Sequence, residues 1–199
     1  QTRSARAGEL TQLLARSARA AVARTGTRYG KVAAVLDSSW SSSGSSEKLR
    51  RPLAVALATS AYLRAASAEY HAFWTTPTSD EILVEPLGAT NLAGPILQAL
   101  EVRPDLLVIV SDGFENDPPG VAGDLVEIAR ENGIVRDALH VNPVFDDQSL
   151  GPRPLHVPAA TTDDAGCWRL PTMGIRDAED LPTVLAFGAF ASATASLGD

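Results

Sequence analysis

The stretch KVAAVLDSSWSSSGSS, residues 31–46, joins a short apolar run to an aspartate and a serine-rich loop. The apolar run, 31–36, is bounded by turn residues, which is typical of a strand that is buried on both faces. A flexible linker would account for the serines, but it would not account for Asp37 at the end of the strand. We therefore interpret this stretch as a central strand that ends in a polar site.

Strand and helix patterns alternate along the rest of the chain. Three apolar runs and one weaker run are expected to be strands: 71–76, 105–110, 138–145 and, more weakly, 82–87. Helical spacing and helix stop signals predict helices at about 47–67, 92–101, 121–133 and 180–190. This alternation predicts an α/β fold, doubly wound and Rossmann-like, with a mostly parallel sheet covered by helices on both faces.

The N-terminal segment has a helical pattern of its own. Apolar residues recur in it at helical spacing: Leu10, Leu13, Leu14, Ala18, Ala21 and Val22. An amphipathic helix is therefore expected at about 4–24. We take residues 1–28 as a support or linker helix and residues 29–199 as one domain.

Charge and composition narrow the class of protein. The chain has a net charge of −7, although its first 28 residues hold six arginines and a single acid, so the globular part is acidic. A nucleic-acid-binding surface shows the opposite balance, so direct nucleic-acid binding by the main body is not expected. No segment approaches the roughly 20 apolar residues of a membrane span. With Cys167 as the only cysteine, no internal disulfide can form, and we expect a cytoplasmic protein without membrane contact.

Two strands of the predicted sheet end in aspartates, Asp37 and Asp112. Ligands of an open parallel sheet bind outside the carboxyl ends of the strands, so both carboxylates are expected at one crevice. The neighbouring loops add the hydroxyls of Ser39, Ser41 and Thr90. Hard oxygen ligands without His or Cys suit Mg²⁺ or Mn²⁺. The sequence therefore predicts a divalent metal site, with no catalytic residue and no organic cofactor.

The same residues carry a family resemblance. The motif DSSWS at 37–41, Thr90 in GATN and Asp112 in SDG resemble, in order and spacing, the metal-ion-dependent adhesion site of von Willebrand factor A domains. The resemblance covers about residues 30–145. Many members have a glycine between the two serines of the motif, whereas this chain has Trp40, and integrin β-type domains also carry an aromatic residue there.

The resemblance implies a role for each of the five residues. Ser39, Ser41 and Thr90 would ligate the ion, Thr90 either directly or through water. Asp37 and Asp112 would hold water molecules on the ion or ligate it themselves. The implied function is divalent-cation-dependent protein binding, in which an acidic residue of the partner completes the metal shell.

Catalysis is less well supported than recognition. The chain contains no Gly-x-Ser-x-Gly elbow, no P-loop and no dinucleotide fingerprint, and the predicted site lacks an obvious general base. We therefore expect a binding domain and not an enzyme. A Mg²⁺-dependent hydrolase with Asp37 as nucleophile remains an alternative, although the comparable phosphatases carry a second aspartate where this chain has Ser39.

A second alternative concerns the setting of the domain. The segment 88–112, GATNLAGPILQALEVRPDLLVIVSD, is also similar to the von Willebrand-type half of the TROVE/Ro ribonucleoprotein family. That resemblance implies a scaffold part of an RNA-associated protein, in which a separate helical-repeat ring holds the RNA. The other setting is a chaperone-associated complex with a MoxR-type AAA ATPase.

The remaining polar and aromatic residues are expected to be structural. The three histidines lack metal-type spacing: His71, His140 and His156. Trp40 is expected to pack against its own loop or a neighbouring helix, because large aromatic side chains are usually mostly buried. Cys167 is expected to be an inert thiol. Two acidic pairs, 146–147 and 163–164, flank a Pro/Gly-rich stretch that we interpret as a solvated loop and not as a second metal site.

Overall fold

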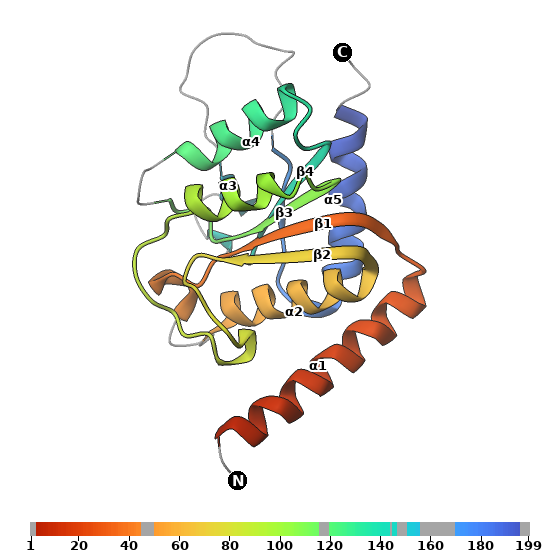
Figure 1. Ribbon diagram of the computed structural model, residues 1–199, viewed down its shortest axis with the longest axis vertical. Helices are drawn as coiled ribbons and strands as arrows, with labels where there is room; N and C mark the ends of the chain where they lie inside the picture. The colour runs from red at the N-terminus through yellow and green to blue at the C-terminus, as the bar shows by residue number, and fades with distance from the viewer. Residues whose placement is uncertain are drawn as a thin grey trace.

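A parallel sheet organises the part of the chain that the computed structural model describes, residues 3–44, 50–115, 120–143, 145–146, 151–155 and 170–195. Within these residues the sheet has five strands in the order β2-β1-β3-β4-β7, and every neighbouring pair is parallel (Figure 1). The strands are β1 (Tyr29–Leu36), β2 (Ser67–Trp74), β3 (Leu106–Val110), β4 (Asp137–Asn142) and β7 (Thr172–Gly174). The predicted doubly wound α/β fold is confirmed.

Helices cover both faces of the sheet (Figure 1). Two helices and the end of a third lie on one face: α2 (Arg51–Ala66), α5 (Leu181–Ala195) and α1 (Arg3–Thr25). The other face carries α3 (Ala93–Glu101) and α4 (Val121–Glu131). The predicted positions of these helices agree with the structure to within a few residues.

The central strands are apolar along their whole length because both of their faces are buried. Along β1, Val32, Ala34 and Leu36 contact the α2/α5 side, whereas Ala33 and Val35 contact the α3/α4 side. This alternation follows from the two-residue period of a strand. Burying a Val or Leu side chain contributes about 1.5–3 kcal/mol, so these buried strands stabilise the fold and give the loops at their ends a firm base.

The strand order reverses between β1 and β3. From β1 the chain crosses to β2 on one side, and from β2 it returns to β3 on the other side of β1. A crevice forms at such a switch point, outside the carboxyl ends of the strands. Asp37 follows β1 and Asp112 follows β3, so the two predicted carboxylates flank the switch point.

Helix α1 forms as predicted, but only part of its predicted apolar face is buried. It packs against α2 (Figure 1), and its Ala7, Ala18 and Val22 are nearly inaccessible. Leu10 and Leu13 remain 54% and 56% exposed, although their spacing predicted that they would face the domain. Small residues on the buried face let the two helices approach closely. None of the described helices is long and apolar enough to cross a membrane.

The predicted strand at 82–87 is wrong. Residues Glu81–Leu83 form the short 3-10 helix η2, in which the Asp80 carboxylate accepts a hydrogen bond from Ile82 N at 3.2 Å. Pro86 has no N–H to donate to a ladder, which disfavours the apolar run as a central strand. The segment instead forms part of the long connection from β2 to α3.

The strand predicted at 138–145 ends earlier, and further strands follow it. β4 ends at Asn142, whereas Phe145–Asp146 forms β5, which pairs antiparallel with β6 (Gly151–Pro152). The fifth strand of the sheet, β7, was not predicted, because three residues beginning with Thr172 do not make an apolar run. Of the residues expected to be structural, His156 and Cys167 lie outside the described residues, as do Asp147 and the acidic pair 163–164.

Candidate metal centre

Asp37 occupies the first position after β1, beside the switch point. Its backbone N donates to Val110 O at 2.9 Å, so the pairing of β1 with β3 extends to Asp37 itself. The residue is only 4% exposed. A carboxylate held this firmly at the edge of a buried sheet has a fixed position but little water around it.

The serine loop folds back onto the Asp37 carboxylate. Ser39 donates to it twice, from its N to Oδ1 at 2.8 Å and from its Oγ to Oδ2 at 3.0 Å. The backbone contact is the local turn that Asp side chains favour. Ser39 Oγ also lies 3.0 Å from Ser41 Oγ. Three of the five predicted ligands are therefore joined in one chain of hydrogen bonds.

Thr75 is a member of this cluster that the sequence did not predict. Its Oγ1 donates to Asp37 Oδ1 at 3.3 Å and accepts from Ser38 N at 2.8 Å. The register of the sheet pairs Leu36 with Trp74, which puts Thr75 beside Asp37. The signal in the sequence was a hydroxyl at the end of the predicted strand 71–76, but its neighbour becomes evident only once β1 and β2 are paired.

Asp112 is the second residue after β3. It is 7% exposed, and its Oδ1 accepts from Phe114 N at 3.0 Å. Asn142 at the end of β4 donates from Nδ2 to the Asp112 carbonyl at 3.0 Å. The loop that carries Asp112 is therefore held both by its own turn and by the next strand.

The two carboxylates influence each other electrostatically. Burial raises the pKa of Asp37 to about 6, hydrogen bonds from Ser39 and Thr75 counteract part of this shift, and the charge of Asp112 adds to it. Two buried carboxylates that repel each other are unfavourable without a neighbouring cation. A divalent ion would reverse this effect, because a positive charge favours the ionised form of both.

Thr90 lies in the connection from β2 to α3, which runs along the serine loop. Trp40 N donates to Gly88 O at 3.0 Å, and Leu87 N donates to Ser38 O at 2.9 Å. Thr90 is 1% exposed, and its Oγ1 has no hydrogen-bond partner among the residues that the structure describes. A buried hydroxyl without a partner calls for an ion or a water molecule beside it.

The five predicted residues therefore fit a small oxygen-ligated cation. Hydrogen bonds or charge connect Asp37 with Ser39, Ser41 and Asp112, and Thr90 follows two residues after a direct contact with the serine loop. A carboxylate pair with hydroxyl oxygens is a hard donor set of the kind that Mg²⁺ and Mn²⁺ take. Nowhere among the described residues do three or more His, Cys, Asp or Glu side chains gather to hold a metal ion; the candidate centre itself offers two carboxylates, and its other oxygens are hydroxyls.

Trp40 is not packed as expected. Its side chain is 69% exposed, although its neighbours Ser39 and Ser42 are almost completely buried. Residues Trp40–Ser43 form the 3-10 turn η1, in which Ser42 donates from N and Oγ to Ser39 O at 3.0 and 2.6 Å. This turn directs Ser42 inward and leaves the indole outside, which explains why the prediction of a packed side chain is wrong.

His140 is hydrogen-bonded to Ser111, the residue before Asp112, and so helps to hold the Asp112 loop. Its Nε2 lies 3.1 Å from Ser111 O, an atom that can only accept, so Nε2 carries the proton and Nδ1 accepts from Thr172 Oγ1 at 3.2 Å. Burial lowers the pKa of His140 to about 4, which keeps the ring neutral. Ser111 Oγ in turn accepts from Gly113 N at 3.1 Å. As expected, this histidine has a structural position.

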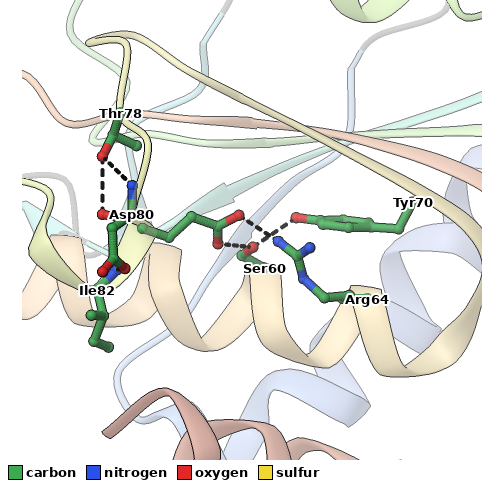
Figure 2. A network of polar contacts seen from close by, with 7 residues as sticks. Ser60, Arg64, Tyr70, Thr78, Asp80 and Ile82 are labelled. Atoms are coloured by element: carbon green, nitrogen blue, oxygen red, sulfur yellow. Dashed lines mark hydrogen bonds and ion pairs between the residues drawn. The ribbon is translucent and has the colours of Figure 1, made fainter. Parts of the chain in front are cut away.

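A polar cluster on α2 anchors the connection that carries Thr90 (Figure 2). Ser60 Oγ donates to Glu81 Oε2 at 2.6 Å, and Arg64 forms an ion pair with the same carboxylate. Tyr70 on β2 donates from its hydroxyl to Ser60 Oγ at 2.9 Å. The first half of the connection is thereby attached to the helix and sheet.

No protein-family model matches the chain, and no curated protein matches its sequence.

Proposed function

We propose that this chain is a divalent-cation-dependent protein-binding domain of the von Willebrand factor A type. The observation that carries the proposal is the pair of buried carboxylates, Asp37 and Asp112, which follow adjacent strands at the switch point, where the charge of Asp112 adds to the raised pKa of Asp37. The unpartnered Oγ1 of Thr90 in the adjoining loop supports it independently.

In this proposal the five residues bind Mg²⁺ or Mn²⁺ from one side. Ser39, Ser41 and Thr90 supply neutral oxygens, and the two aspartates supply negative charge directly or through water. Ser41 is exposed, whereas the other four residues are buried, so the ion would meet solvent on the Ser41 side. Mg²⁺ demands near-octahedral coordination, and a carboxylate of a partner protein is the natural ligand for the open position.

Recognition is favoured over catalysis by the contacts of Asp37. Oδ1 accepts from Ser39 N and Thr75 Oγ1, and Oδ2 accepts from Ser39 Oγ. A carboxylate with both oxygens engaged is suited to positioning an ion more than to attacking a substrate. If the chain were instead a Mg²⁺-dependent hydrolase, it would turn over a phosphate ester, and Asp37→Asn would abolish the turnover.

A pull-down from the native host tests the proposal. The bait is the wild-type chain or Ser39→Ala/Ser41→Ala, each with Mg²⁺ or with EDTA, and Ser17→Ala/Ser79→Ala, two exposed serines elsewhere, is the control. We expect the wild type and the control to recover a partner in Mg²⁺ and not in EDTA, and we expect Ser39→Ala/Ser41→Ala to recover none in either condition. Recovery of the same partners by the wild type and by Ser39→Ala/Ser41→Ala, with and without Mg²⁺, would show that binding uses another surface.

A further inference from the structure

Three large apolar side chains are exposed on the loops around the candidate metal centre. Trp40, Leu87 and Phe114 are 69%, 51% and 48% exposed. Trp40 and Phe114 lie in the loops directly after β1 and β3, and Leu87 N donates to Ser38 O in the serine loop at 2.9 Å, so all three lie at the edge where the strands end. We call these three residues the apolar rim.

Backbone contacts hold the members of the apolar rim close to the candidate ligands. Trp40 lies between Ser39 and Ser41 in the chain, and its N donates to Gly88 O, the residue after Leu87. Phe114 N donates to the Asp112 carboxylate at 3.0 Å. The backbone N of each rim residue is therefore hydrogen-bonded, which reduces the backbone ordering that binding at these three residues would require.

The apolar rim is better explained by a protein partner than by chance exposure. A single exposed apolar residue is ordinary, but several that gather around one site mark a binding surface. Trp in particular is enriched among the residues that dominate the energy of protein interfaces. Their position around a polar centre matches the usual requirement for an interface, in which a specific polar contact is surrounded by apolar contact.

A positively charged side chain, that of Arg153, lies beside Phe114 in the apolar rim. The guanidinium carbon of Arg153 is 4.0 Å from the centroid of the Phe114 ring, and the Arg153 carbonyl accepts from Asn142 Nδ2 at 2.9 Å, which fixes the segment. The side chain is exposed. Together with a bound divalent ion, Arg153 would make this edge attractive to an acidic segment, although the chain as a whole has a net charge of −7.

We infer that the partner presents a carboxylate flanked by large apolar side chains, with the carboxylate on the ion and the apolar side chains on Trp40, Leu87 and Phe114. This inference rests on the proposed function, because the ion orients the segment. An anionic membrane is the competing occupant of exposed aromatic loops beside a cation. It is disfavoured by the net negative charge of the chain, which would be repelled by such a surface.

Selection from a displayed peptide library tests the inference. Each peptide has a central Asp or Glu with randomised flanks, and the wild-type chain is the bait in Mn²⁺. We expect enrichment of large apolar residues next to the acid. The enriched peptides, once synthesised, should bind Trp40→Ala and Phe114→Ala about tenfold more weakly or worse, whereas Mn²⁺ binding by these variants stays unchanged. Phe187→Ala, which removes an aromatic side chain on α5 that is 60% exposed, should bind like the wild type.

The outcomes separate this inference from the proposed function. Acidic peptides that bind only with Mn²⁺, without an apolar preference and without loss in Trp40→Ala or Phe114→Ala, would overturn the inference and leave the proposed function intact. Peptides that bind equally well in EDTA and to Ser39→Ala/Ser41→Ala would overturn the proposed function and the inference with it. Failure to enrich any peptide, combined with Trp40-dependent binding to phosphatidylserine vesicles, would overturn the inference in favour of a membrane.

Discussion

Asp37 is the residue at which the forms of this protein with and without a cation should differ most. It is 4% exposed, its burial raises its pKa to about 6, and the charge of Asp112 adds to the shift. In the absence of a cation, ionisation of Asp37 therefore opposes folding. A bound divalent ion would turn the same ionised carboxylate into a favourable partner.

Stability without metal should accordingly depend on pH through Asp37. Because the folded-state pKa lies above the ordinary value of 3.8, the folded state holds the proton more tightly than the unfolded state. The free energy of unfolding should fall as pH rises from about 4 to about 6, by an amount on the order of 3 kcal/mol, and should stay low above that range. Asp37→Asn cannot ionise and should lack this fall.

Urea unfolding of both proteins across this pH range, in EDTA, measures the effect. Other titrating groups are common to the two proteins, so the difference between their free energies of unfolding isolates Asp37. As pH rises, we expect the free energy of unfolding of Asp37→Asn to increase relative to that of the wild type. Parallel pH profiles would show that the Asp37 pKa is not raised.

Among the elements, the connection between β2 and α3 holds a key position, because it carries Thr90 and Leu87 to the edge of the sheet. Glu81 attaches it to α2 through Ser60 and Arg64 (Figure 2). Tyr70 OH completes the cluster, and burial raises its pKa well above the usual range. The cluster should therefore affect the candidate metal centre without containing any of its ligands.

Ser60→Ala tests this coupling. The change removes the donor to Glu81 and the acceptor of Tyr70 OH, and loss of a buried hydrogen-bond partner costs about 1–3 kcal/mol. We expect lower stability, faster hydrogen exchange at 77–90 and weaker Mn²⁺ binding. Thr59→Ala is the matched control, since Thr59 is equally buried on α2 but bonds only to Val55 O at 2.8 Å.

The control should lose stability but keep its Mn²⁺ affinity. Equal Mn²⁺ affinities for Ser60→Ala and Thr59→Ala would mean that the Glu81 cluster stabilises the fold without positioning the connection.

The overall fold of the molecule follows from apolar patterns that are evident in the sequence. The runs that became β1 and β3 are apolar on both faces, and parallel strands must end at one edge, so the fold and the meeting of Asp37 with Asp112 could be predicted. The three-residue strand β7 could not be predicted, because its position depends on pairing with the edge of β4 and not on its own composition. The strand prediction at 82–87 failed because it gave more weight to the apolar residues than to Pro86, which disfavours a central strand.

Details of the candidate metal centre depend on register and on local turns. Thr75 reaches Asp37 because β1 and β2 pair with Leu36 opposite Trp74, and a sequence pattern does not reveal register. The exposure of Trp40 depends on the 3-10 turn that turns Ser42 inward. Residue type and strand position were therefore sufficient to nominate the five candidate ligands, whereas their supporting contacts required the paired sheet.

Titration with Mn²⁺ at neutral pH, followed by the EPR signal of the free ion, decides whether the candidate metal centre exists. We expect the wild-type chain to bind a single Mn²⁺ that Mg²⁺ displaces, and we expect Ser17→Ala/Ser79→Ala to behave identically. Ser39→Ala/Ser41→Ala and Asp37→Ala should leave the ion free at the same concentrations. Titration curves that coincide for the wild type and Ser39→Ala/Ser41→Ala would contradict the assignment of these residues as metal ligands.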